Sequence, residues 1–129
     1  MNADTAADAV LLVAHGSRVE ASNSEVEALA ERLAERLGPG TRVAHAFLEL
    51  TTPSIPDAID ALVRDGARQI QLIPYFLSAG RHVAEDIPAI AERARTRHPG
   101  VRISVTGHFG ARQGVVELLA GMARNGNTA

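Results

Sequence analysis

Short apolar runs alternate along the chain with longer segments in which apolar residues recur at helical spacing. The apolar runs predict four strands, at residues 9–14, 43–50, 69–77 and 101–105. The first run, AVLLVA, is apolar at every position. Such a run is typical of a strand that is buried on both faces of a parallel sheet.

Four helices are predicted from the helical spacing and from the glycine, proline and polar residues at the ends of each segment. The first helix is expected to be capped by Ser22 or Asn23 and to end at Gly38, and the second to start at Pro53 to Pro56 and end at Gly66. The third is expected to run through Ile87, Ile90 and Ala94 and to end at residues 98–100. The fourth is expected at residues 114–124. A loop, SAGRH, is expected between the third strand and the third helix.

Strand and helix alternate throughout, which predicts an α/β three-layer sandwich with a four-stranded parallel sheet and helices on both faces. A chain of 129 residues suits one domain. We place this domain at residues 9–125, with flexible termini at 1–8 and 126–129. Ligands bind such sheets beyond the carboxyl ends of the strands, so residues that follow a strand are candidates for function.

Three polar side chains meet this positional test. His15 follows the first predicted strand, Glu49 lies at the end of the second, and His82 follows the third. Two imidazoles and a carboxylate form a mixed nitrogen and oxygen set that suits a divalent transition metal, and imidazole can also take up a proton. Taken singly, His15 could cap a helix, while Glu49 and His82 could be ordinary surface residues. Their expected convergence at one sheet edge favours a functional role.

The other histidines are weighed in the same way. His45 lies within a strand among apolar neighbours, and His98 ends a helix, so we interpret both as structural. An imidazolium at the position of His98 could favour the helix dipole. His108 follows the fourth strand and remains a candidate without an assigned role.

Composition removes several classes of function. The net charge of −2 and the lack of a basic run argue against a nucleic-acid partner. Cysteine is absent, which excludes thiolate metal sites and disulfides. The apolar runs are too short to cross a membrane, and the first residues do not read as a signal peptide, so we expect a cytoplasmic protein. Nucleotide-binding glycine motifs and the GxSxG motif are also missing.

The segments LLVAHGSR, AFLELTTPSIPDAID and IPYFLSAGRHVAEDIP resemble the small, single-domain sirohydrochlorin chelatases of the class II (CbiX-type) family, which act in cobalamin and siroheme biosynthesis. The resemblance implies that His15 and His82 hold the metal or accept pyrrole protons, with Glu49 lining the same cleft. It also implies that the tetrapyrrole carboxylates contact Ser17, Arg18 and Arg81, although the two arginines could equally be solvated surface residues. The segment VTGHFGARQG departs from the family pattern.

The resulting hypothesis is a chelatase that inserts Co²⁺, Fe²⁺ or Ni²⁺ into sirohydrochlorin with release of two protons, without an organic cofactor. The metal would be a substrate, with cobalt or iron favoured. The alternatives are a metal- or tetrapyrrole-carrying module of the same fold and a purely structural partner domain. Longer members of the family hold two such halves in one chain, which implies a homodimer here. Tyr75, Phe76 and Phe109 could face the partner copy, or they could fill the core.

Overall fold

The computed structural model describes residues 7–125, with the side chain of His82 left out of the description. Four parallel strands form one sheet in the order β2-β1-β3-β4. The strands are β1 (Ala9–Ala14), β2 (Arg42–Phe47), β3 (Gln69–Pro74) and β4 (Arg102–Val105). The parallel α/β fold predicted from the sequence is therefore confirmed. The expected flexible termini fall largely on residues outside the described range.

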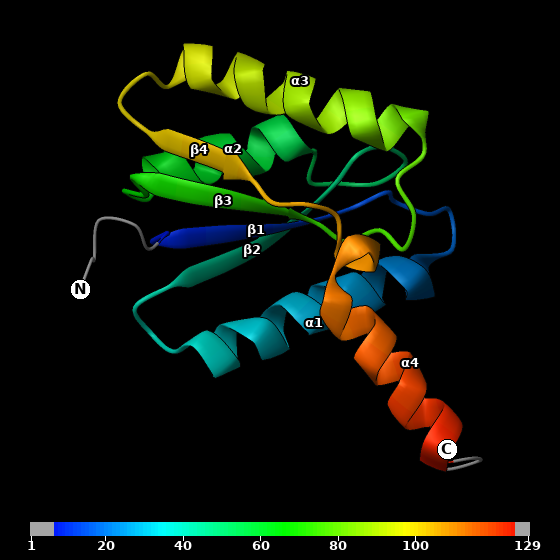
Figure 1. The fold of residues 1–129 in the computed structure, drawn as a ribbon. Helices are drawn as coiled ribbons and strands as arrows, with labels where there is room; N and C mark the ends of the chain where they lie inside the picture. The colour runs from blue at the N-terminus through cyan, green and yellow to red at the C-terminus, as the bar shows by residue number, and fades with distance from the viewer. Residues whose placement is uncertain (1–6, 126–129) are drawn as a thin grey trace.

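Helices cover the sheet on both faces (Figure 1). They are α1 (Glu20–Leu37), α2 (Ile55–Arg64), α3 (Arg81–Arg97) and α4 (Gln113–Asn125), with a short 3-10 helix, η2 (Phe109–Ala111), before the last. The helices α2 and α3 share one face, and α1 lies on the other. Figure 1 shows α4 leaving the sheet instead of lying on it. No helix in the described part of the chain is long and apolar enough to span a bilayer.

The central strand β1 divides its side chains between two apolar clusters. Leu11 and Val13 pack with the residues of α2 and α3, whereas Leu12 and Ala14 pack against α1. All six residues of β1 are buried. This burial confirms the interpretation of the uniform apolar run, because neither face of a central parallel strand meets water.

Several element limits differ from the sequence-based expectations. The helix α1 begins at Glu20, after an N-cap at Val19 that makes no side-chain hydrogen bond, so neither Ser22 nor Asn23 caps it. The strand β2 ends at Phe47 and β3 ends at Pro74, each three residues earlier than predicted. Apolar side chains continue past both ends, and periodicity alone does not separate a strand from the apolar loop that follows it.

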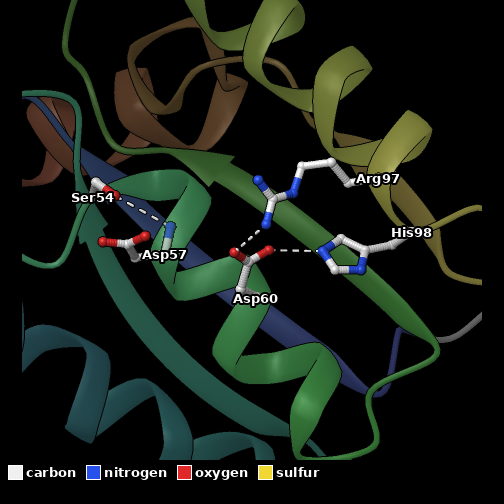
Figure 2. Close-up of polar contacts among 5 residues, drawn as sticks. All are labelled: Ser54, Asp57, Asp60, Arg97 and His98. Carbon is white, nitrogen blue, oxygen red and sulfur yellow. Dashed lines mark hydrogen bonds and ion pairs between the residues drawn. The ribbon is translucent and has the colours of Figure 1, made fainter.

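The helix α2 is fixed at two points (Figure 2). At its start, the backbone N–H of Asp57 donates to the hydroxyl of Ser54 over 3.2 Å, which is a standard N-cap. Midway along α2, Asp60 accepts hydrogen bonds from Arg97 and His98, both at 2.7 Å. These contacts tie α2 to the end of α3. They give His98 the structural role that was expected, through a specific carboxylate partner.

Candidate functional site

The parallel pairing of β1 with β2 brings the loop after each strand to the same edge of the sheet. Ala14 and Phe47 are register partners at the ends of the two strands. Beyond them, the N–H of Glu49 donates to the carbonyl oxygen of His15 over 3.0 Å. The side chains then meet, with His15 Nε2 2.7 Å from Glu49 Oε2. This contact confirms that His15 and Glu49 converge, although Glu49 lies beyond the strand and not within it.

A glycine makes this close approach possible. Gly16 has φ of +101°, and a Cβ atom built there would lie 1.8 Å from the carbonyl oxygen of Glu49. A side chain would therefore collide with the backbone of Glu49, and the positive φ separately disfavours every residue with a side chain. The glycine lets the two loops lie in direct contact and so sets the position of the His15–Glu49 pair.

The pair is open to solvent, and its hydrogen bond leaves one ring nitrogen of His15 available for chemistry. The side chains of His15 and Glu49 are 49% and 57% exposed. A carboxylate can only accept a hydrogen bond, so the hydrogen of this contact belongs to Nε2 of His15. In the neutral imidazole, the lone pair then sits on Nδ1, where it can bind a metal ion or accept a proton. The carboxylate of Glu49 thus orients the ring and selects its tautomer.

The loop after His15 is held by a buried amide. Asn23 is 6% exposed; its side chain accepts from the N–H of Ser17 over 3.0 Å and donates to the carbonyl of Ser17 over 2.8 Å. The hydroxyl of Ser17 accepts from the N–H of Val19 over 2.9 Å. Asn23 therefore anchors the loop, and the Ser17 hydroxyl has a local backbone partner.

Exposed apolar side chains lie in the loops that follow β1, β2 and β3. Val19 follows β1, Leu50 follows β2, and both Tyr75 and Leu77 follow β3, and all four are exposed. Leu50 has φ of +73°, a left-handed conformation that is unusual for a large residue. Phe76 presents its ring edge-on to His15, with 6.5 Å between ring centroids. The edge of the sheet thus combines one polar pair with an apolar rim.

The other predicted site residues are His82, Arg18 and Arg81, and their described contacts do not include the His15–Glu49 pair. His82 lies in the first turn of α3, not in the expected loop, because the helix begins directly after Gly80; its side chain is outside the description. Arg18 and Arg81 are exposed, and Arg81 lies 3.8 Å from Glu85. Among the side chains that the structure describes, no three histidine or acidic groups lie close enough together to hold a metal ion.

Two further histidines lie elsewhere. His45 packs its ring against Phe47 at 5.6 Å between centroids, in keeping with its structural interpretation. His108 caps η2 and lines a cavity of about 200 Å³ beside Val83 and Ile87. No hydrogen bond of the described residues joins the side chain of His108 to the His15–Glu49 pair.

Sequence reasoning missed three residues that build the site: Gly16, Asn23 and Leu50. The glycine directly after a candidate histidine was a usable signal, because glycine marks positions of close backbone approach. A single asparagine among the apolar positions of a helix was a second signal. Leu50 gave none, since a leucine in the left-handed region cannot be recognised from its type.

Comparison with known proteins finds relatives that are named as chelatases. The sirohydrochlorin ferrochelatase of Priestia megaterium is 33% identical over 112 residues, which are 87% of this chain and 42% of that relative. The sirohydrochlorin cobaltochelatase of Methanococcoides burtonii is 32% identical over 116 residues, which are 86% of this chain and 87% of that relative. The chain thus spans less than half the length of the first relative and most of the second.

A solved structure resembles the chain in both fold and sequence. The putative cobalamin (vitamin B12) biosynthesis CbiX protein from Marinobacter aquaeolei VT8 superposes with a TM-score of 0.78 at 30% identity, over 91% of this chain and 94% of that chain. The sequence model of the CbiX family matches residues 9–125. The resemblance seen in the motifs is confirmed, and the chain belongs to the CbiX family.

Proposed function

We propose that this protein is a sirohydrochlorin chelatase, an enzyme that inserts a divalent metal into the tetrapyrrole with release of two protons. The observation that carries the proposal is the His15–Glu49 contact of 2.7 Å at the carboxyl edge of the sheet, within an exposed apolar rim. The names of the relatives, a ferrochelatase and a cobaltochelatase, support the same reaction.

His15 acts in this proposal through Nδ1. Metal insertion requires that two pyrrole N–H groups lose their protons, and a base held beside the ring lowers that barrier. The neutral imidazole can accept such a proton or deliver the metal. The hydrogen bond to Glu49 keeps the ring in the required tautomer, and the carboxylate stabilises the imidazolium that forms after proton transfer.

His82 is proposed as the second imidazole. The start of α3 follows β3, the neighbour of β1 in the sheet, so His82 belongs to the same edge as His15. A pair of imidazoles on that edge would flank the metal on its path to the ring. Holding the metal and the macrocycle together removes much of the entropic cost of their encounter.

The surroundings of the pair suit a flat, carboxylated macrocycle. Val19, Leu50 and Leu77 are exposed apolar side chains that can cover the ring face. In the sequence, Arg18 lies three positions after His15, and Arg81 directly precedes His82. A guanidinium pairs well with a substrate carboxylate. Ser17 contributes chiefly by shaping the loop, since its hydroxyl already holds a backbone N–H.

The physiological metal is proposed from the ligand types. Imidazole with a carboxylate binds cobalt, iron and nickel in the order of the general affinity series, and the relatives' names favour cobalt or iron. No organic cofactor is part of the proposal.

A homodimer is proposed because one domain can cover only one side of the macrocycle. A cytoplasmic location stays a prediction.

The experiment mixes purified protein with sirohydrochlorin and Co²⁺, Fe²⁺ or Ni²⁺ and follows the absorbance of the tetrapyrrole. We expect insertion faster than the uncatalysed reaction at the same concentrations. Binding without acceleration would identify a carrier module instead, and absence of both would reject the proposal. The matched control is His45→Ala, which removes the imidazole that packs against Phe47 within β2.

A further inference from the structure

A cavity at the ends of β3 and β4 is separate from the His15–Glu49 pair. Its volume is about 200 Å³, and Pro74 and Val105, the last residues of the two strands, line it. Val83 and Ile87 of α3 line it as well. Pockets that enclose a whole ligand have volumes of roughly 300 to 1,000 Å³. The cavity can therefore hold one arm of a larger molecule but not the whole molecule.

The cavity lies at the same sheet edge as the pair. The strand β3 lies between β1 and β4, and His15 directly follows β1. Neighbouring strands are about 4.8 Å apart, so the cavity is displaced from His15 by roughly 5 to 10 Å across the sheet. Ala79 and Ala84 line the cavity and are exposed, so it is open to solvent. A macrocycle held above His15 would bring its peripheral substituents to this opening.

His108 supplies the polar group of this apolar cavity. Its side chain is half-buried and lines the cavity beside Thr106. The hydroxyl of Thr106 already donates to the carbonyl of Gly107 over 2.9 Å. In the described part of the chain, by contrast, no hydrogen bond joins the imidazole of His108 to another group. An imidazole carries an N–H donor in both of its protonation states, so His108 has a donor to offer a ligand.

The backbone at His108 is held in place by the loop after β3. His108 is the N-cap residue of η2. Within η2, the N–H of Gly110 donates to the carbonyl of Phe76 over 2.8 Å, and Phe109 packs its ring on Tyr75 with 5.5 Å between centroids. A binding group that is fixed before its ligand arrives loses less conformational freedom on binding. The imidazole is therefore carried by a preorganised segment.

We propose that this cavity binds one carboxylate arm of the tetrapyrrole, with the imidazole of His108 donating a hydrogen bond to the carboxylate. The inference rests on the proposed function and adds a substrate-binding residue to it. Sirohydrochlorin carries acetate and propionate substituents around its ring. Their methylene groups suit the apolar walls, and their carboxylates need a donor when they leave water.

Other occupants suit the cavity less well. A metal ion needs several donor groups, but His108 is the single imidazole, and no carboxylate is present, among the described residues that line the cavity. A purely apolar ligand would leave the N–H of His108 unpaired, which costs free energy away from water. At the start of α3, the N-cap Gly80 makes no side-chain hydrogen bond and the first turn has no acidic residue. The partial positive charge of this helix end adds to the preference for an anion.

The first test measures the binding of metal-free sirohydrochlorin to the full chain from the fluorescence of the tetrapyrrole. His108→Ala should raise the Kd about 10- to 100-fold, the factor for one hydrogen bond to a charged group. The matched control, His45→Ala, removes an imidazole that packs against Phe47 and should leave the Kd unchanged. An unchanged Kd in His108→Ala would overturn the proposal. Circular dichroism checks that each variant is folded.

A second variant fills the cavity and leaves His108 in place. Ala84→Leu enlarges a side chain that lines the cavity, whereas Ala89→Leu makes the same change at an exposed position of α3 outside it. We expect KM for sirohydrochlorin to rise about tenfold or more in Ala84→Leu alone. The turnover number should change little, because the arm is bound equally in the ground state and the transition state. Equal KM values in the two variants would refute the assignment.

A third measurement is independent of chelatase activity. Sodium propionate, a carboxylate that matches one arm, is titrated into the wild type and into Ala84→Leu while NMR follows the imidazole resonances. Millimolar propionate should shift those of His108 in the wild type only and leave those of His45 in place. A shift of both histidines, or of neither, would overturn the proposal. A protein that binds propionate at His108 without inserting metal would reject the proposed function alone, so the two failures are distinguishable.

Discussion

His15 Nε2 lies 2.7 Å from Glu49 Oε2, and the two residues are separated by 34 positions in the sequence. Both side chains are about half exposed, and exposed ion pairs contribute only about 0 to 1 kcal/mol to stability. Stability therefore gives little reason for the contact. Its geometry instead orients an imidazole at the edge where ligands bind parallel sheets.

Glu49→Gln tests that orienting role. The amide can either accept from or donate to His15, so the tautomer is no longer selected. We expect the turnover number of metal insertion to fall about 10- to 100-fold, the range found for residues that orient a ligand, with a smaller change in KM for sirohydrochlorin. Glu27→Gln, on the exposed surface of α1, is the control. A change confined to KM would make Glu49 a substrate contact.

The two proposed imidazoles give a second prediction. His15→Ala and His82→Ala should each lose most of the chelatase activity. For His15→Ala, the midpoint of urea unfolding should shift little because the side chain of His15 is 49% exposed. Activity and unfolding are measured on the same preparations. Wild-type turnover in either variant would remove that histidine from the mechanism.

The sequence was sufficient for the fold because alternating strands and helices leave few arrangements open. It was also sufficient to predict that His15 and Glu49 lie close together, since parallel strands bring their carboxyl ends to one edge of the sheet. It could not show the buried amide of Asn23 or the conformation of Leu50, which depend on backbone angles and tertiary contacts. The position of α4 off the sheet was missed for the same reason.

Leu50→Asn separates substrate contact from stability. Asparagine adopts positive φ more readily than leucine, so the free energy of unfolding should stay the same or rise by up to about 1 kcal/mol. Removal of the exposed apolar side chain should raise KM for sirohydrochlorin. Unfolding by urea and steady-state kinetics check the two effects. In the control, Leu37→Asn at the end of α1, KM should not change; a fall in stability with unchanged KM at Leu50 would contradict the proposed contact.

Asp60→Asn should weaken the fold and spare the site. The carboxylate accepts from both Arg97 and His98 at 2.7 Å (Figure 2), and hydrogen bonds to charged groups are each worth about 1.5 to 3 kcal/mol. Because the amide oxygen of asparagine can still accept one of the two hydrogen bonds, we expect the free energy of unfolding to fall by about 1 to 3 kcal/mol, with turnover unchanged at 25 °C. Asp57→Asn, at the start of the same helix, should cost less. Unchanged stability at Asp60 would show that the tie between α2 and α3 is dispensable.

Gly16→Ala and Gly38→Ala form a matched pair that isolates the contact between the two site loops. Both glycines have positive φ, +101° and +88°, but a Cβ at Gly38 would meet nothing within 4 Å, whereas at Gly16 it would lie 1.8 Å from the carbonyl oxygen of Glu49. The positive φ alone costs about 1 to 3 kcal/mol for alanine, which is the loss expected at Gly38, where φ is 88° and ψ is 175°. At Gly16 the collision adds to this cost, for a total of about 2 to 5 kcal/mol. It also moves Glu49 away from His15, so activity should collapse only in that variant. Urea unfolding and absorbance assays measure both quantities, and equal behaviour of the two variants would mean that the loop contact does not set the geometry of the pair.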